Sequence, residues 1–299
     1  MKDKKLAIIQ SSFELFLSQG YHATSIQDIL NKSNVSKGTF YNYFESKSSL
    51  LQQTLLYREE RIQYQRDLLL DGDNEGDRHI FIKQIEVTFL NKGTINMSEL
   101  MDDAAVSDDS SLIKFMKDLR NSFIEWLYKR LHQVYGEKYE AYIAEMTLIF
   151  AGILQNLFHF SPLMNNKSND YLKLIEYSLT STETIIASKE KGEDALITNE
   201  AFEQNFSIAM QPDSLFSEFA IHTNSLKKAI ERLYGDESQI SELLYELVAF
   251  VQQEIVAVQP NRALILSAMT TFNSFDKLHS SIELADFLQT MQNLGYEMF

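Results

Sequence analysis

Residues 24–50 read TSIQDILNKSNVSKGTFYNYFESKSSL, and their pattern indicates the architecture of the N-terminal part of the chain. A helix is predicted to begin at Thr24, because Thr24 and Gln27 have the spacing of a capping box, in which each side chain satisfies a backbone N–H. Residues 31–36 form the predicted turn, and Asn34 is suited to a positive φ angle there. The stretch therefore predicts a helix followed by a tight turn.

A short helix is predicted after the turn, within residues 35–44. It is too short to be stable alone in water, so it depends on Phe40 and Phe44, which are spaced to pack together onto the preceding helices. Polar side chains and one bare glycine remain on the outside, and they suit close approach to the major groove of DNA. These outward residues are Lys37, Gly38, Thr39, Tyr41, Asn42 and Tyr43.

The residues before this stretch predict a first helix from about Lys4 to Gln19, which ends at Gly20 because glycine readily takes the left-handed C-cap conformation. On the other side, Lys47 opens the next helix near the positive end of its dipole, where it could hold a phosphate. The N-terminal part is thus predicted to be a three-helix helix-turn-helix domain that binds DNA.

The segment resembles the DNA-binding segment of TetR/AcrR-family transcriptional regulators, most clearly over residues 35–47. It departs from the family at Leu30, where a small residue is usual, and at Asn34, where glycine is frequent. The alternative for Tyr41 and Tyr43 is that they form a partly buried aromatic cluster with no role in nucleic-acid binding. The resemblance implies phosphate anchors at Thr24, Tyr41, Tyr43 and Lys47, and a base-reading end at Ser36, Lys37, Gly38 and Thr39.

The charge distribution agrees with DNA binding at one end of an acidic chain. The 299 residues carry a net charge of −15. Residues 1–50 hold six lysines against four acids, which leaves +2 there and −17 in the rest. Since phosphates must be neutralised by cations, the N-terminal part is the expected DNA-binding region.

Composition sets the fold class and the compartment. Three prolines, ten glycines and apolar residues at three-to-four spacing predict an all-α protein with about a dozen helices. The absence of cysteine excludes disulfides and thiolate metal sites, so the cytoplasm is the expected location. No signal peptide or transmembrane helix is expected, and no membrane partner.

Three domains are predicted: a DNA-binding domain at 1–50, a helical effector-binding and dimerisation domain at 51–190, and a helical extension packed on it at 191–299. The resemblance implies that two late helices, about Glu137–Phe160 and Asp170–Lys189, pair with their mates in a homodimer. The residues of this extension lie beyond the usual length of the family's members. It could enlarge the effector domain, add dimer surface or bind another protein.

An effector pocket is expected among the helices from Leu51 to Leu131, where aromatic and methionine side chains suit a bulky apolar small molecule. The acidic surplus favours a cationic amphiphile as one alternative. The other reading is that these side chains fill the core and the acids lie on solvated faces. The candidate pocket residues are Tyr64, Phe89, Met101, Phe123 and Trp126.

No catalytic or metal site is predicted. Residues 71–77 begin like a calcium loop, but Ile82 stands where a chelating glutamate is required, so a solvated acidic loop is favoured. The six histidines show no ligand spacing, and no nucleotide or nucleophile motif occurs. The chain is expected to need no cofactor and not to be an enzyme.

The expected function is that of a ligand-responsive regulator, a homodimer that binds a palindromic operator and is released by its small-molecule effector. Repression, as opposed to activation, follows from the resemblance alone. The alternative is a helical effector-sensing or protein-interaction module that no longer binds DNA.

Overall fold

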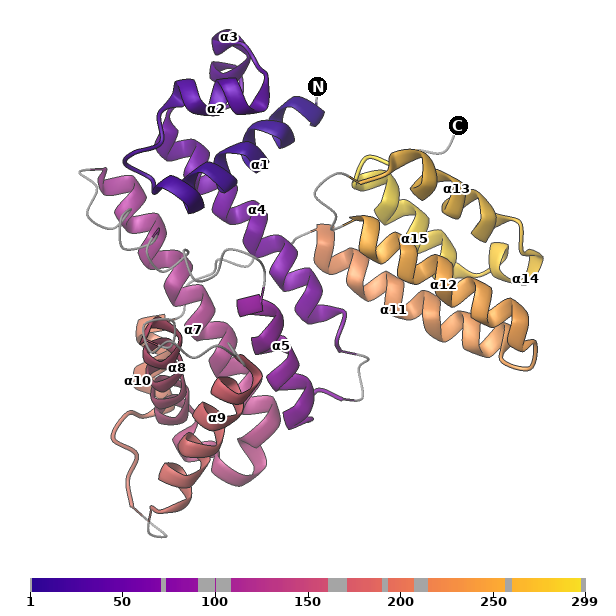
Figure 1. Ribbon diagram of the computed structural model, residues 1–299. Helices are drawn as coiled ribbons and strands as arrows, with labels where there is room; N and C mark the ends of the chain where they lie inside the picture. Colours follow the sequence, from indigo (N-terminus) through magenta and orange to yellow (C-terminus); the bar gives the residue numbers. More distant parts are fainter. Residues whose placement is uncertain are drawn as a thin grey trace. The chain divides into compact units, whose positions relative to one another are not determined.

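The computed structural model describes residues 2–70, 74–90, 100, 109–160, 171–189, 193–206, 215–255 and 260–296. Every regular element in these ranges is helical, which confirms the predicted all-α class (Figure 1). The chain divides into two compact units. The first comprises Met1–Arg58 and Gly72–Gln211, and the second comprises Glu59–Asp71 and Pro212–Phe299.

The N-terminal part of the first unit contains three helices and the start of a fourth. Its elements are α1 (Lys2–Gln19), α2 (Ile26–Ser33), α3 (Lys37–Tyr41) and the first half of α4 (Lys47–Asp67). They share an apolar core to which Leu100, Leu112 and Met116 also belong. The apolar core of the helix-turn-helix therefore includes residues beyond position 50, because side chains from later in the chain complete it.

The rest of the first unit is a helical body. It consists of α5 (Arg78–Leu90), α7 (Ser110–Tyr139), the 3-10 turn η1 (Glu140–Tyr142), α8 (Ile143–Phe160), α9 (Tyr171–Ala187) and α10 (Asn199–Phe206). The predicted start of the helix over Glu137–Phe160 is wrong. The preceding helix α7 continues to Tyr139, and η1 separates it from α8, which begins at Ile143. Phe81, Leu131, Phe150 and Leu179 lie in the core that α5, α7, α8 and α9 share.

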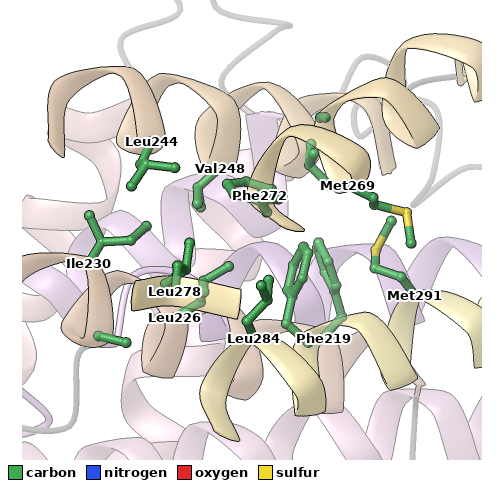
Figure 2. Packing of buried hydrophobic residues seen from close by; sticks show 14 of the residues in the cluster. Phe219, Leu226, Ile230, Leu244, Val248, Met269, Phe272, Leu278, Leu284 and Met291 are labelled. Carbon is green, nitrogen blue, oxygen red and sulfur yellow. The ribbon is translucent and has the colours of Figure 1, made fainter. Parts of the chain in front are cut away.

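In its described residues, the second unit consists of five helices together with the end of α4. The five are α11 (Leu215–Tyr234), α12 (Ser238–Ile255), α13 (Arg262–Asn273), α14 (Asp276–His279) and α15 (Ile282–Asn293). Figure 2 shows side chains from these helices converging on one apolar interior, among them Phe219, Leu226, Val248, Phe272, Leu284 and Met291. Tyr64 of α4 joins this interior, with its ring centroid 5.3 Å from that of Phe219.

The unit boundaries differ from the predicted domain limits of 51–190 and 191–299. Asn199–Phe206 packs in the first unit, where the ring of Phe202 stacks on Tyr128 at 4.6 Å. Glu59–Asp71, in contrast, belongs to the second unit. The difference arises because α4 is one long helix whose two halves are covered by different parts of the chain.

One helical stretch, Ser110–Phe160, contains a window long and apolar enough to cross a membrane by length and composition alone. A core helix of a soluble protein passes the same test. Within this stretch, α8 buries Met146, Phe150 and Leu154 in the core of the body. Packing in this core accounts for the buried share of the window, which is 39%.

Candidate nucleic-acid interface

The start of α2 is fixed by Ser25. The Ser25 hydroxyl accepts a hydrogen bond from the Asp28 backbone N–H at 3.1 Å, and the Asp28 carboxylate accepts one from the Ser25 backbone N–H at 2.9 Å. This is a complete capping box, so the predicted pair of Thr24 and Gln27 was one residue early. The carboxylate also accepts from the Ser25 hydroxyl, and these hydrogen bonds lower the pKa of Asp28.

Thr24 itself lies inside the domain. Its side chain is fully buried, and its hydroxyl donates a hydrogen bond to the carbonyl oxygen of Gly20 at 2.8 Å. The side chain that the resemblance assigned to a phosphate therefore stabilises the link between α1 and α2 instead. We correct that assignment and leave Thr24 out of the interface.

The turn between α2 and α3 has the conformation expected from the sequence. Asn34 adopts φ 53° and ψ 44°, the left-handed region that asparagine tolerates better than most residues. The backbone N–H of Val35 then bonds to the carbonyl of Leu30 at 3.2 Å. These contacts close the C-terminus of α2 and turn the chain sharply into α3.

A buried phenylalanine pair holds α3 in place. Phe40 and Phe44 are both almost fully buried, and their ring centroids lie 5.6 Å apart. Ser36 caps the helix by accepting a hydrogen bond from the Thr39 backbone N–H at 3.2 Å, and the Ser36 and Thr39 hydroxyls lie 2.9 Å apart. With its inner side anchored, α3 turns its other side to solvent.

The solvent-facing side of α3 carries most of the predicted DNA-binding residues. Lys37, Gly38, Tyr41 and Asn42 are exposed, whereas Thr39 and Tyr43 are half-buried. A Cβ atom added at Gly38 would meet nothing within 4 Å, so the protein itself does not require glycine there. Tyr41 is 47% exposed, whereas Tyr43 packs against the domain core. Of the two predicted tyrosine anchors, Tyr41 is therefore the more accessible to DNA.

Lys47 turns inward. Its Nζ donates hydrogen bonds to the carbonyl oxygens of Tyr21 at 2.8 Å and Thr24 at 2.9 Å, with His22 O at 3.4 Å. The same ammonium lies 4.4 Å from the centroid of the Tyr21 ring. The residue predicted to anchor a phosphate thus fastens α4 to the turn between α1 and α2.

A second contact joins this turn to the body. Burial and the charge of Asp109, the N-cap of α7, raise the pKa of Tyr21. The Asp109 carboxylate also accepts from the backbone N–H groups of Ser111 at 2.9 Å and Leu112 at 3.2 Å. The hydrogen bond from Ser48 is the main cause that lowers the pKa of Asp109. No local pattern indicated this interaction, because Tyr21 and Asp109 are far apart in the chain.

The geometry of α2 and α3 agrees with the comparison to known families. Residues 8–54 match the model of bacterial regulatory proteins of the tetR family. This N-terminal segment is therefore similar to the DNA-binding segment of TetR-family regulators. Its matched segment covers α2, α3 and all the predicted DNA-binding residues, and it begins within α1 and ends in the first turns of α4.

Two relatives from Bacillus subtilis (strain 168) are similar to this chain over a longer stretch than the DNA-binding segment. The uncharacterized HTH-type transcriptional regulator YuxN is 31% identical over 159 residues, which is 52% of this chain and 54% of YuxN. The uncharacterized HTH-type transcriptional regulator YerO is 26% identical over 161 residues, 52% of this chain and 55% of YerO. The chain spans about half the length of these curated relatives. A solved structure from Mesorhizobium loti, described as a TetR-family regulator, is 17% identical to this chain, with a TM-score of 0.49. The match covers 62% of this chain and 96% of the chain in that structure.

Three of the five predicted pocket residues come together in the body of the first unit. The Phe123 ring stacks on Trp126 at 5.9 Å and meets Phe89 edge-on at 6.0 Å. Phe158 of α8 lies 4.4 Å from Phe89 and extends the cluster. Tyr64 does not join it, because it packs in the core of the second unit, and Met101 lies outside the described residues.

The body also contains a charged network that joins three helices. Arg78 of α5 donates to both carboxylate oxygens of Glu183 on α9, at 2.8 and 3.1 Å, and the Tyr135 hydroxyl of α7 donates to the same carboxylate. Burial alone would raise the pKa of Glu183, but the hydrogen bonds from Arg78 and Tyr135 outweigh it and lower the pKa. Burial raises the pKa of Tyr135. The network therefore fixes α9 to the rest of the body.

Among the described residues, no group of three or more histidine or acidic side chains is arranged to hold a metal ion. Asp71 and Asp73 of the calcium-like segment lie outside the described part of the chain. In the described part of that segment, Glu75 contacts α7, since its backbone carbonyl accepts from Arg130 at 3.0 Å.

Proposed function

We propose that the chain is a DNA-binding transcriptional regulator that acts in the cytoplasm as a homodimer. It represses by binding a near-palindromic operator, and a bulky apolar small molecule releases it. The match of residues 8–54 to the tetR family model supports DNA binding, and repression follows the resemblance described above.

The observation that carries the proposal is the exposed side of α3. Lys37, Gly38, Tyr41 and Asn42 face solvent, while Phe40 is fully buried beneath them. An ammonium, an amide and a phenol can all donate hydrogen bonds to phosphate oxygens or to acceptors on base edges. The rigid attachment of α3 reduces the conformational entropy lost when these side chains bind.

The homodimer is proposed to form through α8 and α9. Large apolar side chains are exposed on α9, with Tyr177 at 63% and Ile185 at 44%. On α8, Gly152 is exposed and leaves open space above its backbone, which suits close approach of a second helix. A dimer of this kind would present two copies of α3 to successive major grooves, about 34–36 Å apart.

The effector is proposed to bind at the aromatic cluster of Phe89, Phe123 and Trp126. All three side chains are partly buried, and Phe158 connects them to α8. An apolar ligand that displaced these rings would therefore push directly on a helix proposed to form the dimer interface. This contact offers a route by which ligand binding changes the spacing of the two α3 helices.

The decisive experiment is a selection of random duplex DNA by the full-length protein at moderate salt, followed by sequencing of the retained DNA. A two-fold-symmetric motif is expected. The Lys37→Ala variant should retain less DNA, and Lys83→Ala, which removes an exposed lysine of α5, should behave like the unmodified protein.

Retention of no particular sequence, by a protein that remains folded, would contradict the proposal and favour the alternative of an effector-sensing or protein-interaction module. A single, non-symmetric half-site would contradict the homodimer while keeping DNA binding. The salt dependence of affinity adds a check, because each lost phosphate contact reduces the slope by about one.

A further inference from the structure

A buried arginine joins α5 to α7 in the body of the first unit. Arg130 of α7 is 4% exposed, and its Nε donates a hydrogen bond to the side-chain oxygen of Gln84 on α5 at 2.8 Å. Gln84 is fully buried. A guanidinium stays protonated in a protein, so the two helices meet around a permanent positive charge that is largely shielded from water.

The same arginine binds the residues that lead into α5. Its Nη1 donates hydrogen bonds to the backbone carbonyl of Glu75 at 3.0 Å and to the side-chain oxygen of Gln133. The Gln133 amide in turn donates to the Glu75 carboxylate at 3.0 Å. Arg130 therefore holds α5 and the residues before it against one side of α7. We call these four side chains the arginine clamp: Glu75, Gln84, Arg130 and Gln133.

The arginine clamp and the aromatic cluster lie between the same two helices, which pack against each other (Figure 1). On α5, Gln84 lies three residues after Phe81. On α7, Arg130 lies four residues after Trp126, and residues at these spacings are neighbours on a helix surface. The ring centroids of Phe81 and Trp126 are 6.3 Å apart. A change in the separation of α5 and α7 would therefore disturb the clamp and the aromatic rings together.

Loss of the Gln84 acceptor would favour separation of these helices. A buried donor on a charged group that loses its acceptor destabilises the closed arrangement strongly, and entry of water relieves this cost. Water reaches the guanidinium of Arg130 only if α5 and α7 move apart. The rings of Phe89 and Trp126 would then loosen, which is the change that the proposed effector would also cause.

We propose that the hydrogen bond between Arg130 and Gln84 holds the body in its effector-free arrangement, with Arg130 as a positioning residue for the aromatic cluster. The proposal rests on the proposed function for its biological purpose, because breaking this bond would imitate the effector and weaken DNA binding. A general contribution of Arg130 to stability is the other explanation, and the experiments separate the two.

The first test combines fluorescence and amide hydrogen exchange of the full-length protein without DNA. Trp126 is the single tryptophan of the chain, so its emission reports on the cluster. Gln84→Met keeps the side-chain size and removes the acceptor. We expect a red-shifted emission and about tenfold faster exchange in residues 84–90, as loss of a hydrogen bond to a charged group implies. Unchanged emission and exchange would overturn the proposal.

The matched control is Thr182→Val, which removes a buried hydrogen bond elsewhere in the body. The Thr182 hydroxyl donates to the Ser178 carbonyl of its own helix at 2.8 Å. This variant should leave the Trp126 emission unchanged. An equal red shift in Thr182→Val and Gln84→Met would mean that any loosening of the body disturbs the cluster, and would overturn the proposal.

Two further variants separate the hydrogen bond from side-chain shape. Gln84→Glu keeps an acceptor for Arg130 and should show no acceleration of exchange, so an effect equal to that of Gln84→Met would overturn the proposal. In the Gln84→Met background, Arg130→Met removes the buried charge as well. Emission and exchange should then return toward those of the unmodified protein, because replacing both partners costs less than leaving one unsatisfied.

Additive effects of Gln84→Met and Arg130→Met would overturn the proposal. The double variant also covers the case in which Gln84→Met alone unfolds the protein. Recovery of folding in the double variant would then support the proposal, and no recovery would overturn it.

The second test uses the duplex retained by the unmodified protein in the DNA selection. Gln84→Met should weaken binding of that duplex about fivefold, the lower end of typical coupling, although no α3 residue has changed. Unchanged affinity would overturn the claim that the clamp governs DNA binding. If the unmodified protein retains no duplex, the proposed function fails, and the emission and exchange measurements still decide whether the clamp holds the cluster.

Discussion

The Nζ atom of Lys47 lies 2.8 Å from the carbonyl oxygen of Tyr21, so the lysine at the start of α4 is already engaged within the domain. A second carbonyl, that of Thr24, accepts from the same ammonium at 2.9 Å. A phosphate that recruited this lysine would have to compete with both carbonyls. The main role of Lys47 is therefore expected to be the stabilisation of the fold, not the binding of a DNA phosphate.

We predict that Lys47→Ala lowers the free energy of unfolding by about 1.5–3 kcal/mol, the usual contribution of hydrogen bonds to a charged group. Urea denaturation of the full-length protein measures the effect. Lys37→Ala, at an exposed position, should leave the unfolding free energy within about 0.5 kcal/mol. Equal stability of the two variants would contradict the structural role of Lys47.

Gly38→Ala separates folding from DNA contact. The added methyl meets no protein atom within 4 Å, and alanine is favoured over glycine in a helix by about 1 kcal/mol. Stability should therefore stay the same or rise. Affinity for the selected duplex should fall by about 1–3 kcal/mol if the DNA approaches closely at this position. Unchanged affinity, measured by fluorescence anisotropy, would remove Gly38 from the interface.

Asn34 should be replaceable by glycine but not by alanine. Its φ of 53° costs an alanine about 1–2 kcal/mol, while glycine adopts this conformation without strain. Thermal unfolding should show a lower midpoint for Asn34→Ala and little change for Asn34→Gly. The opposite order would mean that the asparagine side chain, not the backbone conformation, determines the turn.

Acid should weaken the N-terminal part through two carboxylates. Hydrogen bonds from Ser25 and from Ser48 lower the pKa of Asp28 and of Asp109 below the ordinary 3.8. As the pH falls through 3.8, the unfolded state takes up protons more readily, so the free energy of unfolding decreases. Urea midpoints measured between pH 6 and pH 3 should fall less steeply in the Asp28→Asn, Asp109→Asn double variant. Identical slopes would contradict the assignment.

Gly152→Arg should disrupt the proposed homodimer without unfolding the chain. Nothing lies within 4 Å of a Cβ atom at this exposed position of α8, so the protomer can accept a side chain there. Sedimentation velocity should show a monomer that binds the palindromic duplex weakly. Ile113→Arg places the same side chain at an exposed site on α7 and serves as the control. Dimers of Gly152→Arg would exclude close packing at this glycine.

Local patterns predicted the helix-turn-helix well, and they failed where distant parts of the chain meet. Asn34, Phe40 and Phe44 behave as their spacing indicated, because a turn and a two-residue apolar pair are decided by neighbouring residues. The capping box at Ser25 matches the same motif as the predicted pair and could have been found by weighing both registers.

The inward turn of Lys47 and the contact of Tyr64 with Phe219 could not be predicted in the same way. Each depends on which backbone or ring comes within reach after folding, and the spacing of residues in one sequence does not contain that information. The aromatic cluster shows the mixed case. Composition indicated Phe89, Phe123 and Trp126, and only the structure adds Phe158 to them.

The continuity of α4 across the two units has a consequence for any shortened version of this protein. Arg58 and Glu59 are consecutive residues of one helix, yet they belong to different units. A chain that ended before α11 would keep the second half of α4 and lose the helices that cover it. Tyr64 and the apolar residues beside it would then face water, and such a fragment should self-associate instead of behaving as a smaller regulator.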